Sequence, residues 1–172
     1  MKLPIGLFYG STTCYTQMVA EQIQQLLGKE NCHLHDLSTT SIQACLSYDS
    51  LIFGIPTWDY GELQEDWDDC WDELTELNLG GRECAIFGLG DQGGYPDWFQ
   101  DAMGYLYHQL IACGAKLQGH WPIQGYQFNE SQALCEGDRY FVGLALDEET
   151  QPELTENRIL EWLKLLGLTD RD

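Results

Sequence analysis

Short apolar runs and longer amphipathic segments follow one another along the chain. The apolar runs predict strands at residues 3–9, 32–37, 51–55, 84–89 and 116–121, with a further run at 140–146. Apolar positions at helical spacing predict helices over residues 16–27, 41–46, 66–77, 98–113 and 154–166. Strands that are apolar along most of their length and alternate with helices are typical of a parallel sheet covered on both faces.

The fold class predicted by this alternation is α/β, with a doubly wound, five-stranded parallel sheet of order 2-1-3-4-5 and helices on both faces. Pro56 is expected to end the third strand. Residues 122–139 are polar and punctuated by glycine, which predicts an excursion before the apolar strand resumes at 140–146. A length of 172 residues predicts a single domain over residues 1–172, with a core of about 4–166.

Three loops of distinctive composition follow strands 1, 3 and 4, and we expect them to meet at the carboxyl edge of the sheet, where ligands of this architecture bind. The first loop lies just before a helix and comprises Ser11, Thr12, Thr13, Cys14, Tyr15 and Thr16. It contains no Lys or Arg, so a phosphate here would be held by backbone N–H groups, the helix dipole and the hydroxyls. An ordinary N-cap is the alternative, and it accounts for one hydroxyl but poorly for four.

The other two loops bring aromatic side chains to the same edge. The second comprises Pro56, Thr57, Trp58, Asp59, Tyr60 and Gly61, and the third includes Leu89, Gly90, Asp91 and Tyr95. Trp58 and Tyr95 could enclose a flat ring, or they could simply cap the core. Backbone N–H groups of Gly90 and Asp91 could face a polar ring edge, and Gly61 permits unusual backbone geometry. A ligand with a phosphate at one end and a flat ring at the other suits these loops, and flavin mononucleotide (FMN) is such a ligand.

Several enzymatic alternatives find little support in the chain. A phosphatase nucleophile at Cys14 would need an arginine six positions later, where Ala20 stands. No Walker loop, CxxC pair or GxSxG motif is present. His33 and His35 point the same way on a strand and could form a metal pair, although surface histidines are the simpler interpretation. His108 and His120 are expected to be structural.

The charge of the chain bears on its partners. The net charge is −20, which makes nucleic acid an improbable partner. Residues 59–101 hold thirteen acids and one base, Arg82. Such a face could steer a basic protein partner, or it could only aid solubility. Seven well-separated cysteines are expected to be reduced thiols. With neither a membrane span nor a signal peptide in the pattern, we expect a soluble cytoplasmic protein.

Several short motifs in combination carry a resemblance to a known family. They lie at residues 6–16, 54–58, 61–67, 88–92, 94–95, 99–102 and 141–147. The chain thereby resembles the long-chain flavodoxins, and most of all the bacterial flavodoxin B (flavodoxin 2) type. The common flavodoxin loop has Gly-Asn or Gly-Lys in place of Cys14-Tyr15, whereas the flavodoxin B type has the same Cys-Tyr pair.

The resemblance implies a flavodoxin-like fold in which residues 119–139 form the insertion in strand five that marks long-chain members. It also implies a low-potential carrier of single electrons that binds FMN noncovalently and is not an enzyme. Residues 11–16 would hold the phosphate, Trp58 and Tyr95 would flank the ring, and 89–91 would line its pyrimidine side. Basic redox proteins, such as a flavodoxin/ferredoxin-NADP reductase, and electron-accepting enzymes would be partners of a monomer. The alternative is an FMN-dependent reductase of a quinone or nitro compound on the same fold.

Overall fold

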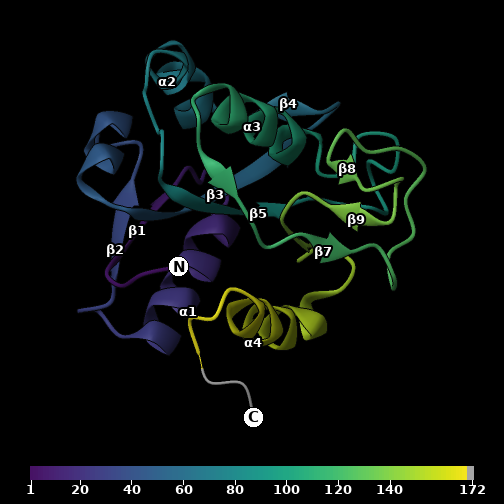
Figure 1. Cartoon of the computed structure of the whole chain (residues 1–172). Coiled ribbons are helices and arrows are strands. Elements are labelled where there is room, and N and C mark those ends of the chain that lie inside the picture. Colours follow the sequence, from purple (N-terminus) through teal and green to yellow (C-terminus); the bar gives the residue numbers. More distant parts are fainter. Residues whose placement is uncertain (170–172) are drawn as a thin grey trace.

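The computed structural model describes residues 1–169 and is built around a parallel sheet with helices on both faces (Figure 1). The strand order is β2-β1-β3-β5-β10, which confirms the predicted order 2-1-3-4-5. These strands are β1 (Ile5–Tyr9), β2 (Cys32–Asp36), β3 (Ser50–Trp58), β5 (Glu83–Leu89) and β10 (Leu144–Leu146). The strands bury almost every apolar side chain because both faces of the sheet are covered.

Two helices cover each face of the sheet. On one face lie α1 (Tyr15–Leu27) and α4 (Thr155–Leu165), and on the other lie α2 (Glu65–Thr75) and α3 (Asp101–Ala112) (Figure 1). Each helix buries an apolar stripe, with Ile23, Trp67, Leu106 and Trp162 all fully enclosed. Two short 3₁₀ segments, η1 (Ile42–Ser47) and η2 (Pro152–Leu154), complete the helical elements. The predicted helix at 98–113 begins only at Asp101, because Gln100 takes a left-handed conformation with φ 64°.

The third strand does not end at Pro56, and this prediction is wrong. Pro56 still pairs beside Leu89 of β5, and the strand then continues to Trp58. Its last two residues pair with β4 (Glu62–Leu63) in an antiparallel hairpin. The strand therefore continues past the proline because its pairing partner changes from β5 to β4. Trp58 lies at the end of a strand and not on a free loop.

The fifth strand is divided by the insertion. β6 (Lys116–Leu117) pairs with the start of β5, and β10 pairs with its end. Between them, β7 (Trp121–Pro122), β8 (Leu134–Cys135) and β9 (Tyr140–Phe141) form a separate antiparallel sheet of order β7-β9-β8. The predicted strand segments at 116–121 and 140–146 were therefore too long, since Trp121 pairs with Phe141 outside the main sheet. The insertion has its own aromatic packing, in which Phe141 meets Phe99, Tyr126 and Phe128.

All seven cysteines are free thiols, and four of them are buried. None of the helices within residues 1–169 combines the length and the apolar character needed to cross a membrane.

Candidate cofactor site

A cavity of about 200 Å³ opens at the carboxyl edge of the sheet, where the three loops were expected to meet. Residues from all three loops line it: Thr13, Tyr15 and Thr16, then Pro56, Thr57, Trp58 and Asp59, then Leu89, Gly90, Asp91 and Tyr95. The loops meet because parallel strands present their carboxyl ends at one edge. The convergence of the loops is thus observed, while the binding role of each residue remains a prediction.

Five of the predicted site residues do not line this cavity. Ser11 Oγ accepts a hydrogen bond from the Gln17 N–H at 3.4 Å, and Thr12 Oγ1 accepts one from Gln64 Nε2 at 3.0 Å. Cys14 is exposed. The remaining two, Tyr60 and Gly61, belong to the turn after Trp58, and the Tyr60 side chain is 66% exposed.

The hydroxyl end of the cavity, formed by Thr13, Tyr15 and Thr16, lies at the N-terminus of α1. The N-cap is Cys14, with φ 69°, and its side chain makes no capping hydrogen bond. The first-turn N–H groups of a helix have no acceptor inside the helix, so they can bind an anion. The capping alternative accounts for Ser11 alone, which leaves Thr13 and Thr16 facing the cavity.

The aromatic end of the cavity is formed by Trp58, Asp59 and Tyr95. The Tyr95 hydroxyl donates a hydrogen bond to Asp59 Oδ1 at 3.5 Å. The negative charge of Asp59, with a smaller contribution from burial, raises the pKa of Tyr95 above its usual value. Tyr60 lies edge-on to Tyr95 and to Trp98, with ring centroids 6.1 and 5.0 Å apart. These contacts place a partly exposed aromatic cluster beside the aromatic end of the cavity.

Gly61 is required by the turn that carries this aromatic end. Its φ is +88°, and an added Cβ would lie 2.8 Å from Asp101 Oδ2. Asp101 is itself buried and accepts a hydrogen bond from the Gln132 N–H at 2.8 Å. Burial raises the pKa of Asp101, an effect that this hydrogen bond partly offsets. A side chain at position 61 would therefore strain the backbone and disturb a buried carboxyl.

The backbone N–H of Gly90, one of the predicted ligand donors, already makes a hydrogen bond within the protein. The Gly90 N–H donates to the Leu146 carbonyl at 3.0 Å, so it continues the ladder between β5 and β10 and does not face the cavity. The expectation that Gly90 offers its N–H to a ligand edge was wrong for this reason. The Asp91 carboxylate folds back to accept from the Gly93 and Gly94 N–H groups at 3.0 and 2.7 Å. This closes the third loop into a compact turn.

Sequence reasoning missed a fourth segment of the wall, which follows β10 and contains Glu148 and Glu149. Asp147, fully buried, fixes this segment: it accepts hydrogen bonds from the Gln92 N–H at 3.0 Å, Gln92 Nε2 at 2.8 Å and the Thr150 N–H at 2.9 Å. One carboxylate thus ties the loop after β5 to the segment after β10. The position of Asp147 after an apolar strand was a usable signal, because that strand ends at the same edge.

The histidine pair predicted as a possible metal site has another role. His33 Nδ1 and His35 Nε2 both hydrogen-bond the Tyr48 hydroxyl, at 3.0 and 2.8 Å. His35 also stacks on Phe8 with ring centroids 4.4 Å apart. The two rings therefore point the same way, as expected, and they pack against the edge of the sheet.

Comparison with known proteins agrees with this architecture. The family model described as flavodoxin matches residues 7–162. This chain belongs to the flavodoxin family. Flavodoxin 2 of Escherichia coli K12 is 50% identical over 158 residues, which are 92% of this chain and 91% of that protein. A flavodoxin of Synechococcus elongatus is 49% identical over 163 residues, 94% of this chain and 95% of that one. The resemblance to the flavodoxin 2 type is thereby confirmed.

A solved flavodoxin structure extends the comparison to three dimensions. The crystal structure of Fusobacterium nucleatum flavodoxin bound to flavin mononucleotide superimposes with a TM-score of 0.90 at 30% identity. The alignment covers 96% of this chain and 98% of that one. The flavodoxin fold of the chain is thus established along nearly its whole length.

Within the flavodoxin loop, the Cys14-Tyr15 pair departs from the common Gly-Asn or Gly-Lys. Cys14 adopts the left-handed conformation that glycine takes readily, with φ 69°. Its side chain is exposed and does not line the cavity, whereas Tyr15 does. A side chain at position 14 therefore leaves the hydroxyl end of the cavity open.

Proposed function

We propose that this chain binds FMN noncovalently in the cavity and carries single electrons between proteins. The observation that carries the proposal is the contrast between the two ends of one cavity. Neutral donors lie at the N-terminus of α1, and two aromatic side chains lie opposite. Bound FMN would supply the one-electron redox chemistry, while the protein binds it, orients it and sets its potential.

The hydroxyl end fits a phosphate. Thr13 and Thr16 supply hydroxyl donors, and the first turn of α1, which the Cys14 side chain does not cap, supplies backbone N–H groups. No Lys or Arg lines the cavity within the described residues 1–169. The phosphate charge would therefore be balanced by dipoles alone.

The aromatic end fits a flat ring in acidic surroundings. Trp58 and Tyr95 can cover a ring and exclude water from it, with Leu89 adding apolar surface. Four carboxylates stand around the same cavity: Asp59, Asp91, Glu148 and Glu149. Added negative charge on a ligand held here is opposed by these carboxylates. This arrangement supports a low reduction potential.

We also propose that the acidic face of α2 receives a basic redox partner, such as a flavodoxin/ferredoxin-NADP reductase. Glu65, Asp68, Asp69 and Asp72 are exposed on or at the start of this helix. A second hollow, lined by Trp58, Glu62, Glu65 and Asp68 among others, adjoins this face. The exposed acids thus lie beside the aromatic end of the cavity, where an electron would leave. A monomer in the cytoplasm suits such a carrier.

Cofactor binding is tested by titrating FMN into the apoprotein and following the quenching of flavin fluorescence. We expect saturation at one FMN per chain and much weaker binding of FAD, because the hydroxyl end offers donors for one terminal phosphate. Equal affinities for FMN and FAD would contradict the proposed orientation. Steady NADPH oxidation by the FMN-loaded protein without a reductase would favour the alternative, a small-molecule reductase.

Partner steering is tested by stopped-flow electron transfer from a basic reductase at several ionic strengths. We expect the rate to fall steeply as salt rises, because exposed charges are screened. Reversing Asp68, Asp69 and Asp72 to Lys should remove most of the salt dependence. A rate that does not depend on salt in the parent protein would argue against steering.

A further inference from the structure

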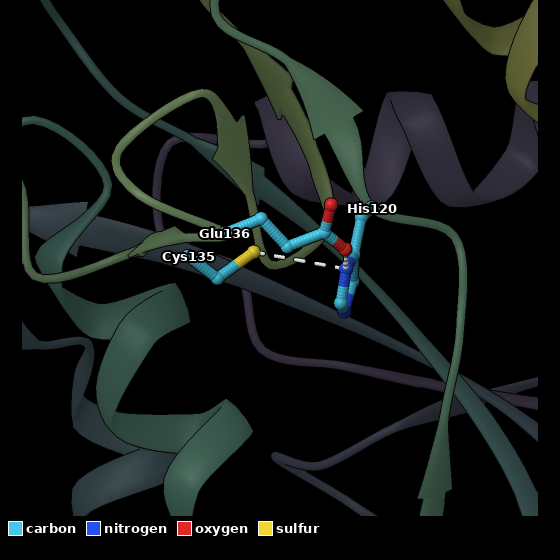
Figure 2. Close-up of side chains that lie close together, drawn as sticks. All are labelled: His120, Cys135 and Glu136. Atoms are coloured by element: carbon cyan, nitrogen blue, oxygen red, sulfur yellow. Dashed lines mark hydrogen bonds and ion pairs between the residues drawn. The ribbon is translucent and has the colours of Figure 1, made fainter.

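A cluster of three potential metal ligands lies on the insertion, away from the cofactor cavity. His120 precedes β7, Cys135 ends β8, and Glu136 begins the turn into β9 (Figure 2). His120 Nδ1 lies 3.0 Å from Glu136 Oε1 and 3.6 Å from Cys135 Sγ. All three ligand atoms lie within 4.8 Å of one another. Within residues 1–169, no other group of three such side chains is this compact.

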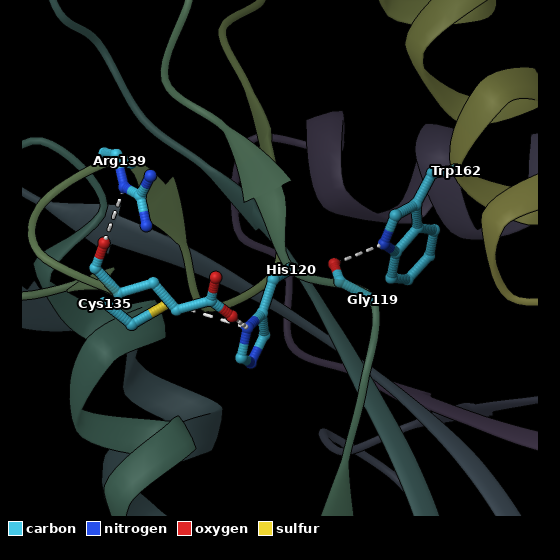
Figure 3. A network of polar contacts seen from close by, with 6 residues as sticks. Gly119, His120, Cys135, Arg139 and Trp162 are labelled. Atoms are coloured by element: carbon cyan, nitrogen blue, oxygen red, sulfur yellow. Dashed lines mark hydrogen bonds and ion pairs between the residues drawn. The ribbon is translucent and has the colours of Figure 1, made fainter.

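The backbone on both sides of the cluster is anchored, as Figure 3 shows. The Gly119 carbonyl, next to His120, accepts a hydrogen bond from Trp162 Nε1 at 2.8 Å. Arg139 Nε donates to the Glu136 carbonyl at 3.1 Å and closes the turn. A Cβ at Gly119 would lie 2.7 Å from Trp162 Nε1, so glycine allows this close approach. The three side chains are therefore presented from fixed backbone positions and need no loop closure to meet.

These separations match the spacing of ligands around a tetrahedral zinc ion. Standard bond lengths to zinc place nitrogen and sulfur ligands about 3.5 Å apart, and nitrogen and oxygen ligands about 3.3 Å apart. The observed values are 3.6 and 3.0 Å. The Glu136 side chain is 51% exposed, so it can rotate to adjust the remaining separation.

We propose that His120 Nδ1, Cys135 Sγ and Glu136 Oε1 form a Zn²⁺ site, with water as the fourth ligand. Nδ1 is the ring nitrogen that faces the cluster, because it contacts both Glu136 Oε1 and Cys135 Sγ. The other ring nitrogen, Nε2, is buried and has no hydrogen-bond partner among residues 1–169. Mixed nitrogen, sulfur and oxygen ligands suit a borderline ion such as zinc and disfavour magnesium and calcium, which take oxygen ligands. On binding, the Cys135 thiol releases its proton to solvent and the thiolate sulfur bonds to the ion.

A reactive cysteine is the competing explanation of this cluster, and the surroundings of Cys135 disfavour it. Reactive cysteines need a positively charged neighbourhood. Here the Glu136 carboxylate lies within 4.8 Å of the Cys135 sulfur.

Zinc at this site would cross-link the segment before β7 to the turn between β8 and β9. His120 lies between β6 of the main sheet and β7, while Cys135 and Glu136 lie at the β8–β9 turn. The ion would thus link the small sheet to the strand from which it departs. Because the cluster is separate from the cofactor cavity, zinc uptake and FMN binding should be independent.

The test is isothermal titration of ZnCl₂ into the FMN-loaded full chain after treatment with a chelator. The native protein is used because an unfolded chain with seven cysteines would bind zinc nonspecifically. We expect one zinc per chain. Cys135→Ser and His120→Gln should each weaken binding by about 100-fold or more, since even outer-shell partners contribute 10–100-fold.

Two control variants distinguish the loss of a zinc ligand from the loss of a nearby charge or of any thiol. Asp138→Asn removes the same charge from the same turn as Glu136→Gln, and Asn tolerates the left-handed conformation found there, with φ 61°. Cys70→Ser removes another partly buried thiol, one outside the cluster. Both controls should keep the parent affinity, and an unchanged flavin spectrum and circular dichroism should show that every variant is folded.

X-ray absorption at the zinc edge decides the ligand set. The parent should show one sulfur neighbour at about 2.3 Å, and Cys135→Ser should lose it. No saturable zinc binding by the parent, or binding that persists unchanged in Cys135→Ser, would overturn the proposal. Since the readouts are zinc affinity and zinc–sulfur distance, a failure of FMN binding would not be confused with a failure of this site.

Discussion

The two ends of the cofactor cavity are built on different physical principles. The hydroxyl end relies on Thr13, Thr16 and the first turn of α1, and no Lys or Arg lines the cavity among residues 1–169. The aromatic end combines Trp58 and Tyr95 with the carboxylate of Asp59, and three further carboxylates line the same cavity. One end therefore suits an anion held by neutral dipoles, while the other suits a flat ring beside negative charge. The difference suggests that the first end determines affinity for FMN and the second its potential.

The largest expected effect is on the free energy of unfolding, and it comes from removing the buried Asp147 carboxylate that joins the loop after β5 to the segment after β10. Asp147→Ala should lower the free energy of unfolding by about 3–5 kcal/mol, since several donors lose their acceptor at about 1–3 kcal/mol each. Urea unfolding of the apoprotein measures this. Asp97→Ala, which removes an exposed carboxylate with one hydrogen bond to Asn129 Nδ2 at 2.7 Å, is the control and should cost little. Similar losses in both variants would mean that Asp147 does not join the two loops in solution.

At the hydroxyl end, Thr16→Val removes a buried hydroxyl that is 1% exposed and keeps the shape of the side chain. FMN binding should weaken by about 1–3 kcal/mol, because the phosphate loses a donor. Riboflavin, which has no phosphate, is the matched ligand, and its affinity should not change. Equal losses for both ligands in fluorescence titrations would place Thr16 away from the phosphate.

The acids that line the cavity are tested by Asp59→Asn combined with Glu149→Gln. A carboxylate roughly 10 Å from the ring, at an effective dielectric near 20, opposes an added electron by about 1.7 kcal/mol, on the order of 70 mV. The double variant should raise the potential of the second one-electron step in a reductive titration. Glu30→Gln, an exposed acid between α1 and β2 at the opposite edge of the sheet, should leave it unchanged. If both proteins give the parent value, solvent screens the acids too well for them to tune the potential.

Trp58, at the aromatic end, should contribute equally to the binding of FMN and of riboflavin, unlike Thr16. Trp58→Ala removes one ring-covering side chain and should weaken FMN and riboflavin by the same amount, about 0.5–1.5 kcal/mol beyond the loss of buried area. The same fluorescence titration measures it. A loss confined to FMN would show that Trp58 acts on the phosphate and not on the ring.

The smallest effect concerns the hydroxyl of Tyr95. Because Asp59 is the main cause of its raised pKa, Asp59→Asn should bring the pKa of Tyr95 down toward its usual 10.0. NMR of a tyrosine-labelled protein follows this titration residue by residue. An unchanged pKa would mean that the Asp59 carboxylate does not face Tyr95 in solution.

Sequence patterns predicted the strand order and the meeting of the three loops, because apolar strands and short loops are local features. Local patterns did not reveal that β3 continues past Pro56, since its last pairing is with β4, a partner chosen by tertiary structure. The engaged N–H of Gly90 depends likewise on β10, more than fifty residues away. The buried carboxylate of Asp147 was missed because its exposure is decided only when two loops come together.

The most direct test of the electron-carrier proposal is a potentiometric titration of the FMN-loaded protein, followed by visible absorption. We predict two separate one-electron steps, with the second far below the potential of free FMN, because the acidic, water-excluding end of the cavity opposes added charge. A single two-electron step at the potential of free FMN would contradict the account.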